Sequence, residues 1–133
     1  MRYLLDTNVC IEFLRGRKPL LVARFTSVPQ ADKHLCPVVQ AELYFGAFKS
    51  AQPQASLATV KAFISRFPVL PFDEASAETY GVIRADLAGQ GRLIGPYDLQ
   101  IAAIALAHGA TLVTHNTGEF SRVAGLQLDD WEI

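Results

Sequence analysis

The chain has 133 residues, of which 50% are hydrophobic, with 12 Lys and Arg against 13 Asp and Glu. This length supports one well-buried core and is too short for two ordinary domains, so we expect a single domain over residues 1–133. The near-zero net charge excludes a strong general attraction to nucleic acid. The longest apolar run, residues 99–107, is shorter than the ~20 residues that span a bilayer, and Asp6 interrupts the segment where a signal peptide needs its apolar core. We therefore expect a cytoplasmic protein that makes no use of a membrane.

Strand-like and helix-like segments alternate along the chain. The expected strands are residues 3–5, 34–37, 69–72, 111–114 and 126–128. The expected helices are residues 7–15, 20–28, 38–50, 54–67, 74–90 and 97–108. Proline and glycine residues mark most of the boundaries. This alternation predicts an α/β sandwich with a central parallel sheet of four to five strands flanked by helices.

Asp6 follows a short apolar segment, Tyr3 to Leu5, that is typical of a buried strand. A helical pattern begins at Thr7 and Asn8, so we expect the Asp6 carboxylate at the carboxyl edge of the sheet, where open α/β folds place their sites. The alternative is that Asp6 only caps the helix, because Asp, Thr and Asn are all good N-caps.

Two more carboxylates lie on predicted helices. Glu42 stands among apolar residues of the helix at 38–50, and an unpaired buried carboxylate is costly, so Glu42 needs water, a cation or a metal. Asp98 follows Gly95-Pro96-Tyr97 in the first turn of the predicted helix at 97–108, where the helix dipole favours an anion. A solvated Glu on a helix face and an acidic residue in a first helical turn are the ordinary alternatives.

Four segments carry more information in their order than any one of them does alone. They are LLDTN at residues 4–8, VVQAELYFG at 38–46, IGPYDLQIAAIA at 94–105 and VTHNTGEF at 113–120. In this order and spacing they resemble the PIN-domain ribonucleases, and most closely the VapC-type toxins of bacterial toxin–antitoxin pairs. The resemblance runs from residue 1 to Trp131. It implies a PIN-like three-layer α/β sandwich and an enzyme that hydrolyses RNA phosphodiester bonds with a bound metal ion.

The carboxylates and the resemblance together imply a site for Mg2+, with Mn2+ as a substitute. Hard divalent cations take oxygen ligands, often one or two carboxylates with water and substrate phosphate. Asp6 and Asp98 would hold the ion, with Glu42 binding directly or through water, and the ion would orient an attacking water and stabilise charge on the scissile phosphate. Without a cation these carboxylates repel each other, so we expect at least one raised pKa.

The fourth acidic position is ambiguous. Many PIN domains carry an Asp after the fourth strand, whereas this chain has Asn116, with Glu119 three residues later. Asn116 would serve as a neutral ligand or hydrogen-bond partner, and we expect Glu119 to supply the charge, because one helical turn returns its longer side chain toward the strand end. The residues expected to position water, phosphate or carboxylates are Thr7, Asn8, Thr114, Asn116 and Tyr97. Capping, turn formation and structural packing are their ordinary alternatives.

The cysteines and histidines show no ligand spacing. Cys10 falls in the first apolar helix and Cys36 in a predicted strand, which is typical of small buried hydrophobic residues. His34, His108 and His115 are expected at the surface or beside the site. We therefore expect no zinc site.

The main functional hypothesis is a Mg2+-dependent endoribonuclease that cleaves tRNA or other structured RNA, with Asp6, Glu42, Asp98 and Glu119 as its catalytic carboxylates. The alternatives are a related metal nuclease acting on DNA or RNA ends, and a catalytically weakened PIN scaffold that binds RNA or protein. A phosphatase with an Asp nucleophile is disfavoured, because the segment after the first strand lacks a second Asp for acid–base work. A phosphoacceptor domain is disfavoured because the N-terminal strand lacks a paired acid.

The resemblance also implies protein partners, namely a VapB-type antitoxin and a second copy of the chain. Helices at residues 20–28, 38–50 and 54–67 have more apolar surface than a small sheet readily covers. In VapC-type proteins such helices contribute to the homodimer and to the antitoxin groove, and we expect Phe48 and Phe63 to take part.

Overall fold

The computed structural model describes residues 1–133, and its centre is a four-stranded sheet in the order β2-β1-β3-β4, with every pair parallel. The strands are β1 (Tyr3–Leu5), β2 (Lys33–His34), β3 (Thr111–Val113) and β4 (Leu128–Asp129). Leu4 lies opposite His34 on one side and Leu112 on the other, while Val113 lies opposite Asp129. The parallel α/β sheet predicted from the sequence is confirmed.

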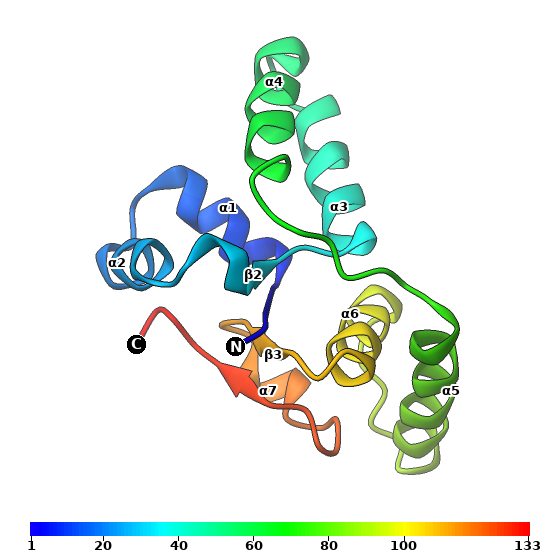
Figure 1. Cartoon of the computed structure of the whole chain (residues 1–133). Coiled ribbons are helices and arrows are strands. Elements are labelled where there is room, and N and C mark those ends of the chain that lie inside the picture. The colour runs from blue at the N-terminus through cyan, green and yellow to red at the C-terminus, as the bar shows by residue number, and fades with distance from the viewer.

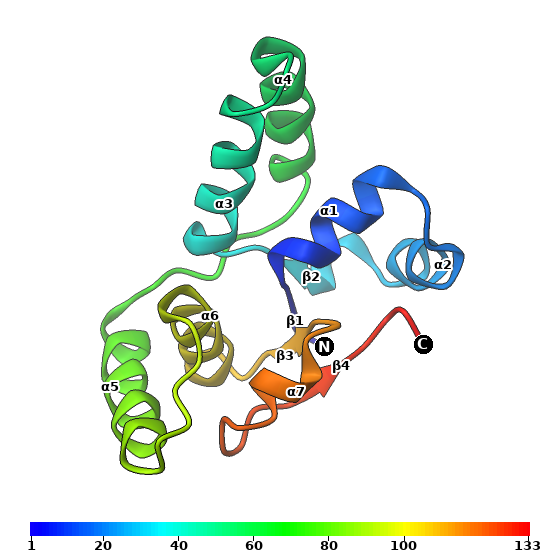
Figure 2. The same cartoon turned by 180° about the vertical axis from the view of Figure 1, so that it is seen from behind.

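Helices cover the sheet on both sides. They are α1 (Thr7–Arg15), α2 (Pro19–Ser27), α3 (Pro37–Phe48), α4 (Pro53–Ile64), α5 (Glu74–Gly89), α6 (Pro96–Ala107) and the one-turn α7 (Thr117–Phe120), with a 3-10 turn η1 (Gln30–Asp32) before β2. Figures 1 and 2 show α1 and α2 on one side of the sheet and α6, backed by α5, on the other, while α3 and α4 lie side by side and project away from it. Four helices begin with proline in the first turn, where the missing N–H group costs nothing.

The middle layer is almost completely apolar. Leu4, Leu5, Leu112 and Val113 in the two central strands are fully buried, which is typical of a parallel sheet covered on both faces. Helix α6 buries the run Ile101 to Ala105 between the sheet and α5, and its small alanines allow close packing. None of the helices is long and apolar enough to cross a membrane.

Aromatic side chains connect the first two helices, α4 and the C-terminal residues. Phe13 stacks on Phe25 with ring centroids 3.8 Å apart, and Phe25 meets Trp131 edge-on at 6.0 Å. Phe63 lies 6.3 Å from Phe25 and 4.9 Å from Phe67. Edge-on and offset aromatic pairs of this kind stabilise a core beyond the area they bury. Trp131, 2% exposed, thereby anchors the end of the chain.

Two strand predictions were wrong in extent. Residues 69–72 form no sheet strand: the segment makes a single parallel bridge between Val69 and Leu35, and Pro71, which lacks an N–H group, cannot continue the pairing. The predicted strand at 34–37 lies at 33–34 instead, because Cys36 is already the N-cap of α3. Helix α7 was not among the predicted helices.

The two cysteines behave as the sequence indicates. Cys10 and Cys36 are both free and fully buried. Burial raises the pKa of the Cys36 thiol to about 11, so little of it ionises at neutral pH. The prediction that both are small buried hydrophobic residues is confirmed.

Candidate active site

Four carboxylates converge at the carboxyl edge of the sheet. Asp6 directly follows β1, Glu42 lies on α3, Asp98 is in the first turn of α6 and Glu119 is in α7. The pKa of Asp98 is raised to about 6, first by burial and then by the negative charges of Asp6, Glu119 and Glu42. Because each of the other three carboxylates acts on Asp98, the structure gathers residues that lie as much as 113 positions apart in the sequence (6 and 119).

Asp6 is a helix cap and a member of this cluster at the same time. It is 7% exposed, and its Oδ1 accepts a 2.8 Å hydrogen bond from the backbone N–H of Thr7, which caps α1. Its Oδ2 accepts a 2.9 Å hydrogen bond from the hydroxyl of Thr114 at the end of β3. Burial raises the pKa of Asp6, and these two hydrogen bonds lower it in part. The capping interpretation therefore does not compete with a role in the cluster.

Thr7 connects the first carboxylate to the second. Its hydroxyl donates a 3.0 Å hydrogen bond to Oε1 of Glu42, while its N–H bonds to Asp6. Glu42 is half-buried and lines a groove, so its charge is neither buried without a partner nor freely solvated. Thr7 thus contacts two of the carboxylates, and its expected positioning role stays a prediction.

Glu119, rather than Asn116, brings the fourth charge to the cluster. The Asn116 side-chain N–H donates a 3.0 Å hydrogen bond to Oε2 of Glu119, and the negative charge of Glu119 helps to raise the pKa of Asp98. The backbone N–H of Asn116 donates to the Thr114 hydroxyl at 3.0 Å. Asn116 therefore contacts the charged residue directly, and the expectation that Glu119 completes the site stays a prediction.

A groove of about 1350 Å³ runs from these residues along α1, α3 and α4. Four of the lining residues are Thr7, Asn8, Glu42 and Tyr97, and Tyr97 is 62% exposed. The part farther along α3 includes Phe45, also exposed. A surface open to solvent thus reaches Glu42, one of the four carboxylates.

The groove differs from the sequence expectation in two respects. Residues of α1 line it, and none of α2 does, because α2 packs against α1 on the side nearer the C-terminus. Phe63, expected at an interface, is 2% exposed and belongs to the core, whereas Phe48 is 62% exposed outside the groove.

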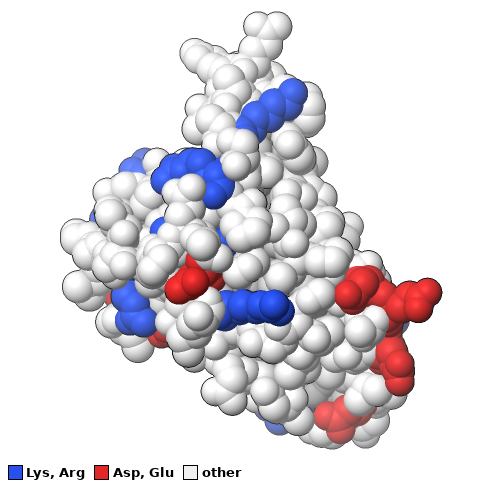
Figure 3. Space-filling model, in the orientation of Figure 1, with Lys and Arg blue, Asp and Glu red and all other residues white.

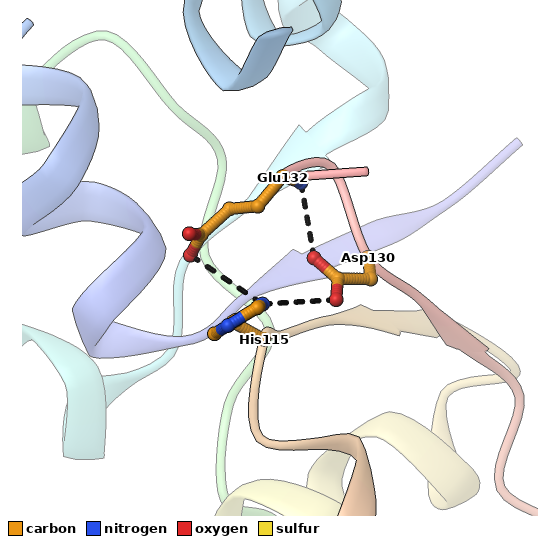
Figure 4. A group of neighbouring side chains, drawn as sticks. All are labelled: His115, Asp130 and Glu132. Atoms are coloured by element: carbon orange, nitrogen blue, oxygen red, sulfur yellow. Dashed lines mark hydrogen bonds and ion pairs between the residues drawn. The ribbon is translucent and has the colours of Figure 1, made fainter. Parts of the chain in front are cut away.

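A second group of polar side chains was not foreseen. His115, Asp130 and Glu132 present three ligand-type atoms within 4.8 Å of one another (Figure 4). His115 directly follows Thr114, and its ring points toward Asp130 and Glu132 near the C-terminus. No spacing rule could reveal this group, since the histidine and Asp130 are 15 positions apart and meet only because β3 and β4 are neighbours.

Charge is unevenly distributed over the surface. Figure 3 shows acidic side chains gathered over α5 and basic ones over the opposite part of the same face. The exposed acidic residues of this region are Asp73, Glu74, Glu78 and Asp86. Although the net charge is near zero, one side of the surface is acidic and another is more basic.

The sequence matches the PIN domain family over residues 3–126. The chain belongs to the PIN-domain family. It is 44% identical over 131 residues to the tRNA(fMet)-specific endonuclease VapC of Shigella flexneri, and 38% identical over 131 residues to the protein of the same description from Salmonella typhimurium, with 98% of each chain covered in both cases. The predicted resemblance to VapC-type toxins is confirmed.

Solved structures agree with this assignment of the PIN domain. A chain in a crystal structure of DNA-bound VapBC from Salmonella typhimurium superposes with a TM-score of 0.92 at 38% identity, over 98% of both chains. VapBC2 from Rickettsia felis, bound to a DNA fragment from its promoter, gives a TM-score of 0.91 at 32% identity over 98% of this chain and 99% of that one. The PIN-like fold predicted from the sequence is therefore confirmed.

Proposed function

We propose that this PIN-domain protein is a Mg2+-dependent endoribonuclease, the toxin of a VapBC-type pair, that cleaves tRNA or another structured RNA. The observation that carries the proposal is the convergence of Asp6, Glu42, Asp98 and Glu119, of which Glu42 lines an open groove. Relatives described as tRNA(fMet)-specific endonuclease VapC support the choice of RNA, and of tRNA in particular.

The side chains present suit a hard divalent cation. All four offer carboxylate oxygens, the ligands that Mg2+ and Mn2+ prefer, and no sulfur or imidazole is among them. Burial raises the pKa of Asp6, and burial together with repulsion from the other carboxylates raises the pKa of Asp98. A cation bound between them would stabilise both anions. Asp6 and Asp98 would hold Mg2+, with Glu42 beside them and Mn2+ as a substitute.

The bound ion would supply an activated water and would stabilise negative charge on the phosphate. The protein's own contribution is to fix the oxygens. Thr7 and Thr114 each bind one oxygen of Asp6, and Thr7 also binds Glu42. Burial and the negative charges of Asp6, Glu119 and Glu42 raise the pKa of Asp98, and Asn116 orients Glu119.

The groove would bring RNA to these carboxylates. Asn8 and the exposed ring of Tyr97 line it beside Glu42, in positions where an amide and an aromatic face contact a ribose or an unpaired base. Arg15 and Lys49 line it farther along and would contact phosphates.

The same groove would accept a VapB-type antitoxin. Half of its 20 lining residues are hydrophobic, which suits the apolar face of an amphipathic segment laid between α1, α3 and α4. The solved VapBC complexes support such a partner. The exposed Phe48 on the projecting α3–α4 pair, outside the groove, would contribute to a homodimer.

The test is cleavage of a circular RNA. An endonuclease linearises a circular RNA that contains a tRNA hairpin when Mg2+ is present, whereas an enzyme acting on ends leaves it intact. We expect cleavage by the wild type, none with a chelator and none with Asp98→Asn. An intact circle in the presence of Mg2+ or Mn2+, with a linear RNA degraded from its ends, would support the alternative nuclease. No cleavage of either RNA would support the weakened scaffold.

A further inference from the structure

The segment from Thr114 to Asn116 holds two of the four carboxylates. Thr114 donates to Asp6 at 2.9 Å, and the side chain of Asn116 donates to Glu119 at 3.0 Å. The backbone N–H of Asn116 also donates to the Thr114 hydroxyl at 3.0 Å, which ties the two ends of the segment together. The location of this segment therefore sets the location of the oxygens of Asp6 and Glu119. His115 is its middle residue.

The side chain of His115 is fixed by the C-terminal residues. Its Nδ1 lies 3.0 Å from Oδ2 of Asp130 and 3.8 Å from Oε2 of Glu132 (Figure 4). A carboxylate only accepts hydrogen bonds, so Nδ1 carries the proton and donates. The side chain of His115 is 58% exposed, and these two acids are its only polar partners in the protein.

Asp130 and Glu132 are themselves held in place through the carboxylate oxygens that do not face His115. The backbone N–H of Glu132 donates to Oδ1 of Asp130 at 3.0 Å, and the ammonium of Lys18 donates to Oε1 of Glu132. Each carboxylate therefore has one oxygen bound by another group and one directed at the imidazole. Between them Trp131 is buried and meets Tyr3 edge-on at 5.4 Å, which fixes this end of the chain against β1.

We propose that Asp130 and Glu132, acting through His115, are positioning residues of the nuclease centre. They touch neither the four carboxylates nor the groove, and they act by fixing the segment that holds Asp6 and Glu119. Functional groups need placement to within about 0.5 Å, so a loosened segment lowers the rate without removing any reacting group. The proposal rests on the proposed nuclease function.

The test compares two replacements of similar size. His115→Asn keeps an N–H donor close to the position of Nδ1, and His115→Leu fills similar space without a donor. We expect His115→Leu and Asp130→Asn each to lower kcat about tenfold with KM for RNA unchanged, and His115→Asn to retain most of the activity. The double variant His115→Leu with Asp130→Asn should be no slower than either single variant, because both changes act on the same contact between residues 115 and 130. Asp32→Asn, which removes a carboxylate paired with the N-terminal amine, is the control and should match the wild type.

A second measurement separates this proposal from the nuclease function. Mn2+ binding to RNA-free protein, followed by calorimetry, should weaken severalfold in His115→Leu and recover in His115→Asn. If the wild type cleaves no RNA and this pattern of Mn2+ binding holds, the positioning role stands and the nuclease function fails. Unchanged kcat and unchanged Mn2+ affinity in folded His115→Leu would overturn the positioning role. A loss of kcat or Mn2+ affinity that is equally large in His115→Asn would also overturn it, and so would a wild type that binds no Mn2+. A second Mn2+ equivalent lost in Asp130→Asn would show that the three side chains bind metal themselves, and would overturn it too.

Discussion

The hydroxyl of Thr114 donates a hydrogen bond of 2.9 Å to the carboxylate of Asp6, although the two residues lie 108 positions apart in the chain. The contact exists because β1 and β3 are parallel neighbours, so both residues leave the sheet at the same edge. It offsets part of the effect of burial on the pKa of Asp6. The order of the strands therefore affects the pKa of Asp6.

Thr114→Val tests this contact, because valine has the shape of threonine without the hydroxyl. The pKa of Asp6 should rise further, since a hydrogen bond to its charged form is lost. We expect metal-dependent cleavage to fall by about 10- to 100-fold. Stability should fall by about 1–3 kcal/mol, because a buried acceptor loses its donor. Thermal unfolding and cleavage at several Mg2+ concentrations measure both effects, and Thr111→Val, at the other end of β3, is the control.

Asp6→Asn and Asp98→Asn should each abolish RNA cleavage while the protein remains folded. Each change keeps the side-chain size and removes one anionic oxygen from the proposed cation site. Added Mg2+ should raise the unfolding temperature of the wild type and leave that of the variants unchanged. Full cleavage by either folded variant would show that its carboxylate is not needed.

The stability of the metal-free protein should depend on pH through Asp98. Its pKa is 3.8 in the unfolded chain and about 6 in the folded one, so between these values the folded state binds more protons than the unfolded state. The contribution of Asp98 to stability therefore falls as the pH rises from about 4 through 6, and it is restored on acidification. The wild type minus Asp98→Asn difference in urea unfolding free energy, measured at pH 5 and pH 7.5 with a chelator, isolates this contribution. A difference independent of pH would contradict the shifted pKa.

Glu119→Gln should lower metal-dependent RNA cleavage more than Asn116→Ala does. Glu119→Gln removes a negative charge from the cluster, so it should weaken metal-dependent cleavage strongly and lower the pKa of Asp98. Asn116→Ala removes only the 3.0 Å hydrogen bond that orients Glu119, and a smaller loss, partly restored by more Mg2+, is expected. Metal titrations in the same buffer compare the two. Near-normal cleavage by Glu119→Gln with collapse in Asn116→Ala would reverse the assignment.

Phe45 and Phe48 form a matched pair for the antitoxin groove. Both are phenylalanines of α3 with similar exposure, 65% and 62%, but only Phe45 lines the groove. Phe45→Glu should weaken antitoxin binding by at least about tenfold, because it places a charge in an apolar contact. Phe48→Glu should leave antitoxin binding unchanged and lower dimer affinity. Calorimetric titration with the antitoxin and light scattering of the free toxin measure the two effects, and equal loss of antitoxin binding in both variants would contradict the proposed groove.

The sequence predicted the parts of the site that local patterns encode. Asp6 could be placed because a short apolar strand and a helix start enclose it, and Asp98 because Pro96 opens its helix. The choice of Glu119 over Asn116 followed from the reach of one helical turn and stays a prediction, while the charge of Glu119 does act on the pKa of Asp98. All three arguments use residues within a few positions of each other.

What could not be predicted depends on distant segments. His115 meets Asp130 only through the pairing of β3 with β4, and no local pattern contains that information. The apolar residues at 69–72 resemble a strand, but Pro71 limits their pairing to a single bridge. Phe63 shows the same limitation, because a helical stripe does not tell whether the core or a partner covers it.

The position of β1 at the centre of the sheet has a consequence for synthesis on the ribosome. β1 is synthesised first, yet one of its two neighbours in the sheet is β3, at Thr111–Val113. Thr114, which donates a hydrogen bond to Asp6, and Asn116, which donates one to Glu119, are synthesised later still. The nascent chain therefore carries Asp6, Glu42 and Asp98 for most of its elongation without an assembled centre. In a chain built in this order, the four carboxylates come together only when synthesis of the protein is almost complete.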